Sequence, residues 1–182
     1  KLHFDALRLG NILNDVTIAE PYLRDANIIG FDMKSLRWHA TNLPSGNPNG
    51  IDARTICALA RYAGISDRLD IFGVFELPNS NVFNQLLAQI IWYFIEGYSC
   101  RFDEYPVHTS KGFTKYTVAL SDMEMIFFQS EKSNRWWLEV TNNSYLNNKN
   151  KTTTLLPCTH QDYLDACNDM IPDMWWKAIK RG

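Results

Sequence analysis

Asn27-Ile28-Ile29-Gly30-Phe31-Asp32-Met33 is a compact apolar run that carries one carboxylate close to its end. A run of this kind predicts a β-strand buried on both faces, with a functional or capping residue at its tip. A second run, Leu69-Asp70-Ile71-Phe72-Gly73-Val74-Phe75-Glu76-Leu77, again places a carboxylate near its end, just before Pro78. Because fully buried strands are typical of parallel sheets, the two runs together predict an α/β fold.

The segments around these two runs have helical periodicity. Residues 51–62 predict an amphipathic helix between the strands, which ends at Gly64 in a left-handed cap. Strand, helix and strand then form a βαβ unit of the usual right-handed kind. Residues 81–98 predict a longer helix that is apolar all round and is therefore expected to be heavily covered. A short helix is expected within residues 15–26, with a boundary at Pro21.

After Arg101 the pattern changes to short β-type runs, which predict an antiparallel meander over residues 113–120, 124–129 and 135–140. The Asn-, Lys- and Thr-rich residues 141–154 predict an exposed loop, followed by helices over residues 159–170 and from residue 173 onward. We therefore expect an α/β part in residues 1–100. Residues 101–182 would form a β-meander and helical extension packed on it.

The amino-acid composition argues against several classes of protein. The chain has 182 residues, 46% of them apolar, and a formal net charge of -2, which excludes global disorder and provides no field for binding a nucleic acid. The longest apolar stretch, residues 82–98, contains Glu96 and several amides, so we expect no membrane span. Four scattered cysteines without a CxxC pair predict reduced thiols and a cytoplasmic protein. The start at Lys1, without Met or an apolar leader, suggests a fragment.

Asp32 and Glu76 are the two carboxylates at the ends of the predicted strands. Ligands of open parallel sheets gather at the carboxyl ends of the strands, so these positions predict a site. The alternative is that each carboxylate caps a following turn or pairs with Arg37. None of the four histidines has metal-ligand spacing, and only His39 lies in the loop beside this site. Asp32 and Glu76 are therefore the candidate site residues, and His39 is the one histidine to test beside them.

A resemblance to a known family rests on four motifs and their order, Gly30-Phe31-Asp32-Met33-Lys34, Pro48-Asn49-Gly50, Arg61-Tyr62-Ala63-Gly64 and Phe75-Glu76-Leu77-Pro78. The chain resembles the C-terminal part of the ureohydrolases, which comprise arginases, agmatinases and formimidoylglutamases. Residues 102–106 and 132–137 are similar to an extension found in a divergent formimidoylglutamase-like branch. The resemblance implies a three-layer αβα parallel sheet of the arginase type. It also implies hydrolysis of linear amidine C–N bonds by two manganese ions that a hydroxide bridges.

The family pattern Phe-Asp-x-Asp-x-x-Asp-Pro is altered in this sequence. Asp32 matches it and would be a metal ligand, but Lys34 and Arg37 stand where carboxylates are expected. An ammonium group near a divalent cation turns attraction into repulsion, so Lys34 could instead replace a metal and pair with Asp32. Glu76 matches the position that anchors the cationic substrate group.

Two functions follow from these motifs. One is an amidine hydrolase of the formimidoylglutamase type with an altered or degenerate manganese site, and the other is a non-catalytic binding or assembly protein with no cofactor. The expected partner is a small amidine or guanidino compound. A homo-oligomer is compatible with both functions.

Overall fold

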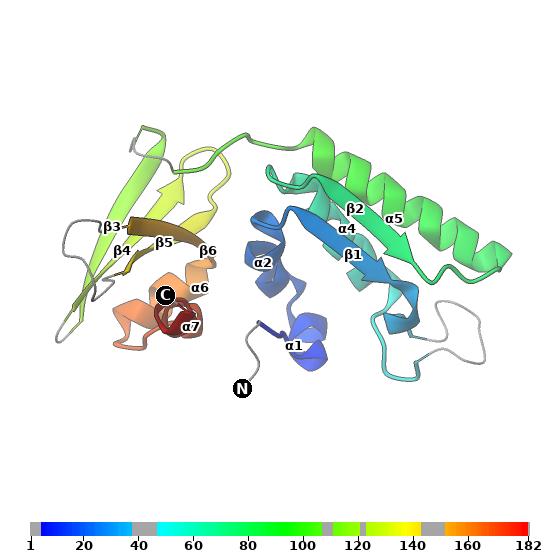
Figure 1. Ribbon diagram of the computed structural model, residues 1–182, viewed down its shortest axis with the longest axis horizontal. Coiled ribbons are helices and arrows are strands. Elements are labelled where there is room, and N and C mark those ends of the chain that lie inside the picture. Colours follow the sequence, from blue (N-terminus) through cyan, green and yellow to red (C-terminus); the bar gives the residue numbers. More distant parts are fainter. Residues whose placement is uncertain (1–4, 38–46, 107–110, 121–122, 143–151, 182) are drawn as a thin grey trace. The chain divides into compact units, whose positions relative to one another are not determined.

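The computed structural model describes residues 5–37, 47–106, 111–120, 123–142 and 152–181. The chain divides into two compact units, Lys1–Asp103 (unit 1) and Glu104–Gly182 (unit 2), each described by itself. Unit 1 contains a parallel sheet of two strands and unit 2 an antiparallel sheet of four strands (Figure 1). With six α-helices in the described part of the chain, the expected mixed α/β composition is confirmed.

Unit 1 is built around the two apolar runs. Strand β1 (Ile28–Asp32) pairs in parallel with strand β2 (Ile71–Phe75), and Gly30 lies opposite Gly73 in their register. The remaining elements of this unit are α1 (Leu9–Asn14), the 3-10 helix η1 (Val16–Ala19), α2 (Glu20–Arg24), the 3-10 helix η2 (Met33–Ser35), α4 (Ala53–Ile65) and α5 (Asn81–Ser99). Pro21 marks the change from η1 to α2, as the sequence predicts.

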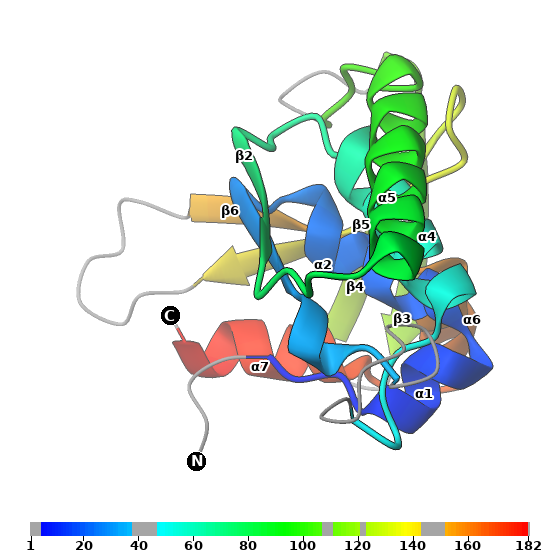
Figure 2. The same ribbon diagram turned by 90° about the vertical axis from the view of Figure 1, so that its right-hand side faces the viewer.

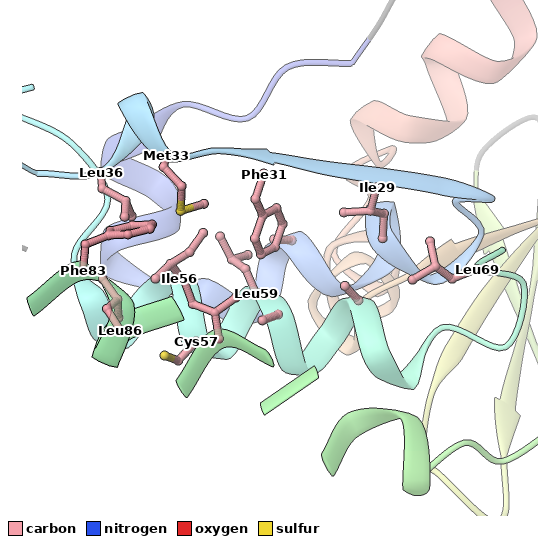
Figure 3. Packing of buried hydrophobic residues seen from close by; sticks show 14 residues of the cluster. Ile29, Phe31, Met33, Leu36, Ile56, Cys57, Leu59, Leu69, Phe83 and Leu86 are labelled. Carbon is pink, nitrogen blue, oxygen red and sulfur yellow. The ribbon is translucent and has the colours of Figure 1, made fainter. Parts of the chain in front are cut away.

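The core of unit 1 lies on one face of its sheet. Side chains of β1 alternate between the two faces, and Ile29 and Phe31 point towards Ile56 and Leu59 of α4 (Figure 3). Both α4 and α5 lie on the same side of the two strands (Figure 2). Ile28 on the other face is exposed, so the prediction of strands buried on both faces is wrong. Burial alternates along β1, and Ile28 is a large apolar residue at an outward position.

Helices α4 and α5 approach each other until their backbones touch. A Cβ atom on Gly64 would lie 2.1 Å from the carbonyl oxygen of Phe94, and one on Gly97 would lie 2.2 Å from that of Arg61. Gly64 therefore lies inside α4, and its predicted role as a left-handed helix cap is wrong. Its small size serves the helix crossing instead.

Helix α5 has the predicted bounds to within one residue, but its predicted coverage is wrong. Phe83, Leu86 and Ile90 face the core, whereas Trp92 and Ile95 are among its exposed apolar residues. Among the described helices, none combines the length and the apolar character that crossing a bilayer requires.

Unit 2 contains the predicted meander and one additional strand. The sheet order is β3 (Phe113–Leu120), β4 (Met123–Ser130), β5 (Trp136–Asn142) and β6 (Thr152–Cys158), all antiparallel. The prediction of a loop over residues 141–154 is wrong at both ends, because β5 continues to Asn142 and β6 begins at Thr152. The part of that loop between the strands lies outside the described residues.

Two helices follow β6 and pack on the sheet of unit 2. Helix α6 (His160–Cys167) begins with a capping box in which Thr159 and Asp162 satisfy each other's backbone amides. Trp136 of β5 stacks on Tyr163 of α6 with ring centroids 4.9 Å apart. Helix α7 (Asp173–Arg181) adds Met174, Trp175 and Ala178 to the same apolar cluster.

Candidate functional site

The two strand-end carboxylates lie on neighbouring strands. Asp32 is the last residue of β1 and pairs in register with Phe75, the last residue of β2. Glu76 is the next residue along the chain. We call Asp32, Lys34 and Glu76 the strand-end site.

The Asp32 side chain caps the turn that follows β1. Its Oδ1 atom accepts a hydrogen bond from the backbone amide of Lys34 at 2.8 Å, and the Ser35 hydroxyl donates to the Asp32 carbonyl at 2.6 Å. These bonds begin the 3-10 helix η2, which turns the chain immediately after the strand. The capping role that the sequence allows for Asp32 is therefore present.

Lys34 forms an ion pair with Glu76 and not with Asp32. Its Nζ atom lies 3.0 Å from Oε2 of Glu76. Glu76 has a backbone φ of 55°, a left-handed conformation that disfavours a residue with a side chain by ~1–2 kcal/mol. Residues held in such conformations cluster at functional sites.

The ion pair of the strand-end site is open to solvent. The side chain of Lys34 is 71% exposed and that of Glu76 is 54% exposed. An exposed pair contributes only ~0–1 kcal/mol, because water and salt screen the two charges. Another cation could therefore displace the Lys34 ammonium from Glu76 at little cost.

Close backbone contacts hold the segment after η2 against the start of α4. The amide of Arg37 donates to the Ile51 carbonyl at 2.8 Å, and the amide of Ile51 donates to the Ser35 carbonyl at 2.9 Å. A Cβ atom on Gly50 would lie 2.4 Å from the Ser35 oxygen, so only glycine fits between them. Gly50, part of the motif Pro48-Asn49-Gly50, thus supports the turn that carries the strand-end site.

Arg37 interacts with Asp52, the N-terminal cap of α4. The hydrogen bond from the Thr55 amide, supported by the nearby charge of Arg37, holds the pKa of Asp52 below its ordinary value. The charge of Arg37 thus favours the ionised form of Asp52, the side chain that caps α4. His39, the other candidate substrate-binding residue, lies outside the described residues.

The described residues of the strand-end site do not fit a pair of manganese ions. In the part of the chain that the structure describes, no group of three His, Cys, Asp or Glu side chains could hold a metal ion. Glu76 faces an ammonium group, and one oxygen of Asp32 is used by the Lys34 amide. Manganese sites need several oxygen or imidazole donors without a competing cation.

A second candidate surface lies along α7. Asp173, Trp176, Lys177 and Lys180 line a shallow depression of about 380 Å³. The Nζ atom of Lys180 lies 5.7 Å from the centre of the Trp176 ring, within the range of a cation–π interaction. The sequence signal for this surface is a pair of lysines three residues apart beside a tryptophan. One helix alone forms this depression, so it has no opposing wall.

No protein-family model, curated protein or solved structure matches this chain. The ureohydrolase resemblance therefore rests on the motifs in the sequence.

Proposed function

We propose that the chain is the C-terminal portion of a ureohydrolase-fold protein of the formimidoylglutamase-like branch, and that it binds an amidine or guanidino compound without hydrolysing it. In this proposal the two-stranded sheet of unit 1 belongs to a three-layer αβα architecture. The parent protein would then be a binding or assembly protein that has lost the manganese centre.

One observation carries the proposal, the ion pair between Lys34 and Glu76. In the family pattern, a carboxylate stands at the position of Lys34, and Glu76 would receive the cationic nitrogen group of the substrate. In this chain the ammonium group of Lys34 already contacts the Glu76 carboxylate. An amidinium group is planar and can donate two parallel hydrogen bonds to a carboxylate, whereas an ammonium group acts as a point charge. A ligand of this class has an advantage over Lys34 in binding to Glu76.

The charge of the strand-end site favours a cationic ligand over an anionic one. Asp32 and Glu76 carry two negative charges against the single positive charge of Lys34. Displaced from Glu76, the long Lys34 side chain can extend into water at little cost. On binding, the cationic ligand would therefore replace the Lys34 ammonium group at Glu76. Asp32 would be a second carboxylate near the ligand, at the end of the neighbouring strand.

Calorimetric titration of the chain with acetamidine and with arginine, in manganese-free buffer, tests this proposal. We expect Glu76→Gln to weaken binding about tenfold or more, because it removes the charge of the hydrogen-bonded acceptor. Lys34→Ala should tighten binding by up to about fivefold, the equivalent of the ~1 kcal/mol that the exposed pair contributes. Binding that is insensitive to both changes would overturn the proposed role of Glu76.

Elemental analysis after incubation with Mn²⁺ decides between the binding protein and the hydrolase. We expect the unmodified chain to retain no manganese above that of a Lys34→Ala, Glu76→Gln double variant. Two manganese ions per chain, together with release of ammonia or urea from an amidine or guanidino compound, would support the hydrolase instead. Lys34→Asp shows whether one restored carboxylate recovers metal binding.

A matched pair of glycine variants separates binding from stability. Glu76→Gly should relieve the left-handed backbone strain and stabilise the chain by up to ~1 kcal/mol while abolishing amidine binding. Asp103 also has a positive φ, of 50°, and lies outside the strand-end site. Asp103→Gly should change stability in the same direction and leave binding unchanged.

A further inference from the structure

The outer face of α5 is an apolar surface that no other element of unit 1 covers. Trp92 is 69% exposed, Ile95 is 55% exposed and Tyr98 is 56% exposed. Trp92 and Ile95 lie on the side opposite the core residues of this helix, and Tyr98 lies on the flank next to them. Figure 1 shows α5 at the edge of unit 1, with α4 on its inner side. We call Ala88, Ile91, Trp92, Ile95 and Tyr98 the α5 outer face.

We infer that the α5 outer face binds a second copy of this chain, in an antiparallel helix pair about a two-fold axis. This inference does not depend on the strand-end site or on its ligand. It commits to a homodimer because the charge, area and shape of the face each fit an identical partner.

Charge is the first argument for self-association. A two-fold axis brings a surface against itself, so any charge within it would face a like charge nearby. Glu96 is the only charged residue of α5, and it lies at the border of the outer face, with its Oε1 atom 3.4 Å from Nε of Arg61 on α4. At the far end, the Arg101 guanidinium lies 4.2 Å from the centre of the Tyr98 ring. Both charges are peripheral, and no residue of the face itself is charged.

Area is the second argument. With about 150–250 Å² for a whole aromatic side chain, the exposed parts of the outer-face side chains amount to roughly 500 Å². That is the size of the largest apolar patch on a typical monomer, about 300–600 Å², which is often functional. Asn84, Gln85 and Ser99 border the face and would add the polar rim. A standard interface buries about 800 Å² per partner, which this face and its rim approach.

Shape gives the register of the pair. Ala88 lies one helical turn before Trp92, so a large knob and a small depression are neighbours on the face. An antiparallel pair whose axis passes near residue 90 places Trp92 of each copy over Ala88 of the other. Close helix pairs have axes about 8–10 Å apart, which requires a small residue opposite a large one. The Gly64 and Gly97 crossing fixes α5 on α4, so the face is rigid before it binds.

Sedimentation equilibrium of the 182-residue chain tests the inference. We expect the unmodified chain, of 21.1 kDa, to sediment with twice its own mass. Trp92→Lys should weaken the dimer by about a hundredfold or more, as expected for a central tryptophan. Ala88→Glu should do the same from the other side of the contact. Tyr93→Lys is the matched control, because Tyr93 is an exposed aromatic residue of the same helix outside the defined face, and it should remain dimeric.

Mixing the two single variants tests the register. A copy with Trp92→Lys and a copy with Ala88→Glu would place the introduced ammonium against the introduced carboxylate once and retain one contact between Trp92 and Ala88, so the mixture should form heterodimers. A monomeric unmodified chain overturns the inference, and so does a dimer that ignores both substitutions. Loss of helical circular dichroism in either single variant would also overturn it, because it would show that the face packs within the monomer.

Discussion

The two sheets of this chain are covered in different ways. In unit 2, none of the large apolar side chains that the structure describes in β3 to β6 is exposed, and α6 and α7 pack on one face. In unit 1, α4 and α5 cover one face of the parallel sheet, while Ile28, Ile71 and Phe75 remain exposed. Parallel sheets are normally covered on both faces, whereas antiparallel sheets tolerate one open face. The difference indicates that the described part of the sheet in unit 2 buries its large apolar side chains, whereas the sheet of unit 1 leaves some of its own exposed and available for further contacts.

The sharpest test of this comparison is to remove one buried aromatic ring from each unit. Phe83 and Phe127 are both fully buried, so replacing either with Ala should cost about 3–5 kcal/mol. We expect Phe83→Ala to abolish protection from amide hydrogen exchange in α4 and α5 while β3 to β6 stay protected. Phe127→Ala should give the reverse pattern. Loss of protection in both units from either variant would mean that they unfold together.

A smaller effect is expected where α4 and α5 touch. Gly64→Ala must push the two helices apart, because its Cβ atom would lie 2.1 Å from the Phe94 oxygen, and overpacking of this kind costs about 1–3 kcal/mol. Gly10 in α1 is the matched control, since a Cβ atom there meets nothing within 4 Å. Gly10→Ala should stabilise unit 1 by about 0.5–1 kcal/mol. The midpoint of urea unfolding measures both effects. A midpoint for Gly64→Ala equal to that of the unmodified chain would show that the two helices can move apart without loss of stability.

The smallest effect concerns the caps of the same two helices. Asp52→Ala and Ser80→Ala each remove an N-terminal cap, of α4 and α5 respectively, and should each cost ~1 kcal/mol at neutral pH. Because folding lowers the pKa of Asp52, its contribution is fully present above the ordinary carboxyl pKa. It is lost as the pH falls through the lowered pKa of the folded state.

The measurement for the cap prediction is the difference in unfolding free energy between each variant and the unmodified chain, taken at neutral and at acidic pH. The difference for Asp52→Ala should shrink in acid, and that for Ser80→Ala should stay constant because serine does not titrate. A pH-independent Asp52 difference would argue against a charged cap.

Local patterns predicted the elements well, because each strand and helix is encoded by its own residues. The runs that became β1 and β2, and the helix that became α5, have nearly the expected bounds. Strand β6 was missed, because Thr152 to Thr154 continue a polar segment and are ordered by pairing with β5. That pairing is non-local and leaves no periodic signal in the segment itself.

The sequence did not predict which helix faces are buried or which side chains form ion pairs, because both depend on residues far apart in the chain. The role of Gly64 depends on its contact with Phe94 of α5, which lies 30 residues further along the chain (94 − 64), so the local pattern of a glycine near a helix end predicts only a cap. The strand-end positions of Asp32 and Glu76 were predictable. The partner of Lys34 was not, because the turn formed by η2 decides which carboxylate its ammonium reaches.

The contact between Gly64 and Gly97 has a mechanical consequence. Where two helix backbones touch, no side chains lie between them that could change rotamer. The helix pair therefore resists sliding and moves as one rigid body. One end of this rigid helix pair is the N-terminal cap of α4 at Asp52, two residues after Gly50, which supports the strand-end site. Its outer flank is the α5 outer face. A small tilt of the helix pair at its Gly50 end would therefore move the α5 outer face as a rigid body, without bending of the helices in between.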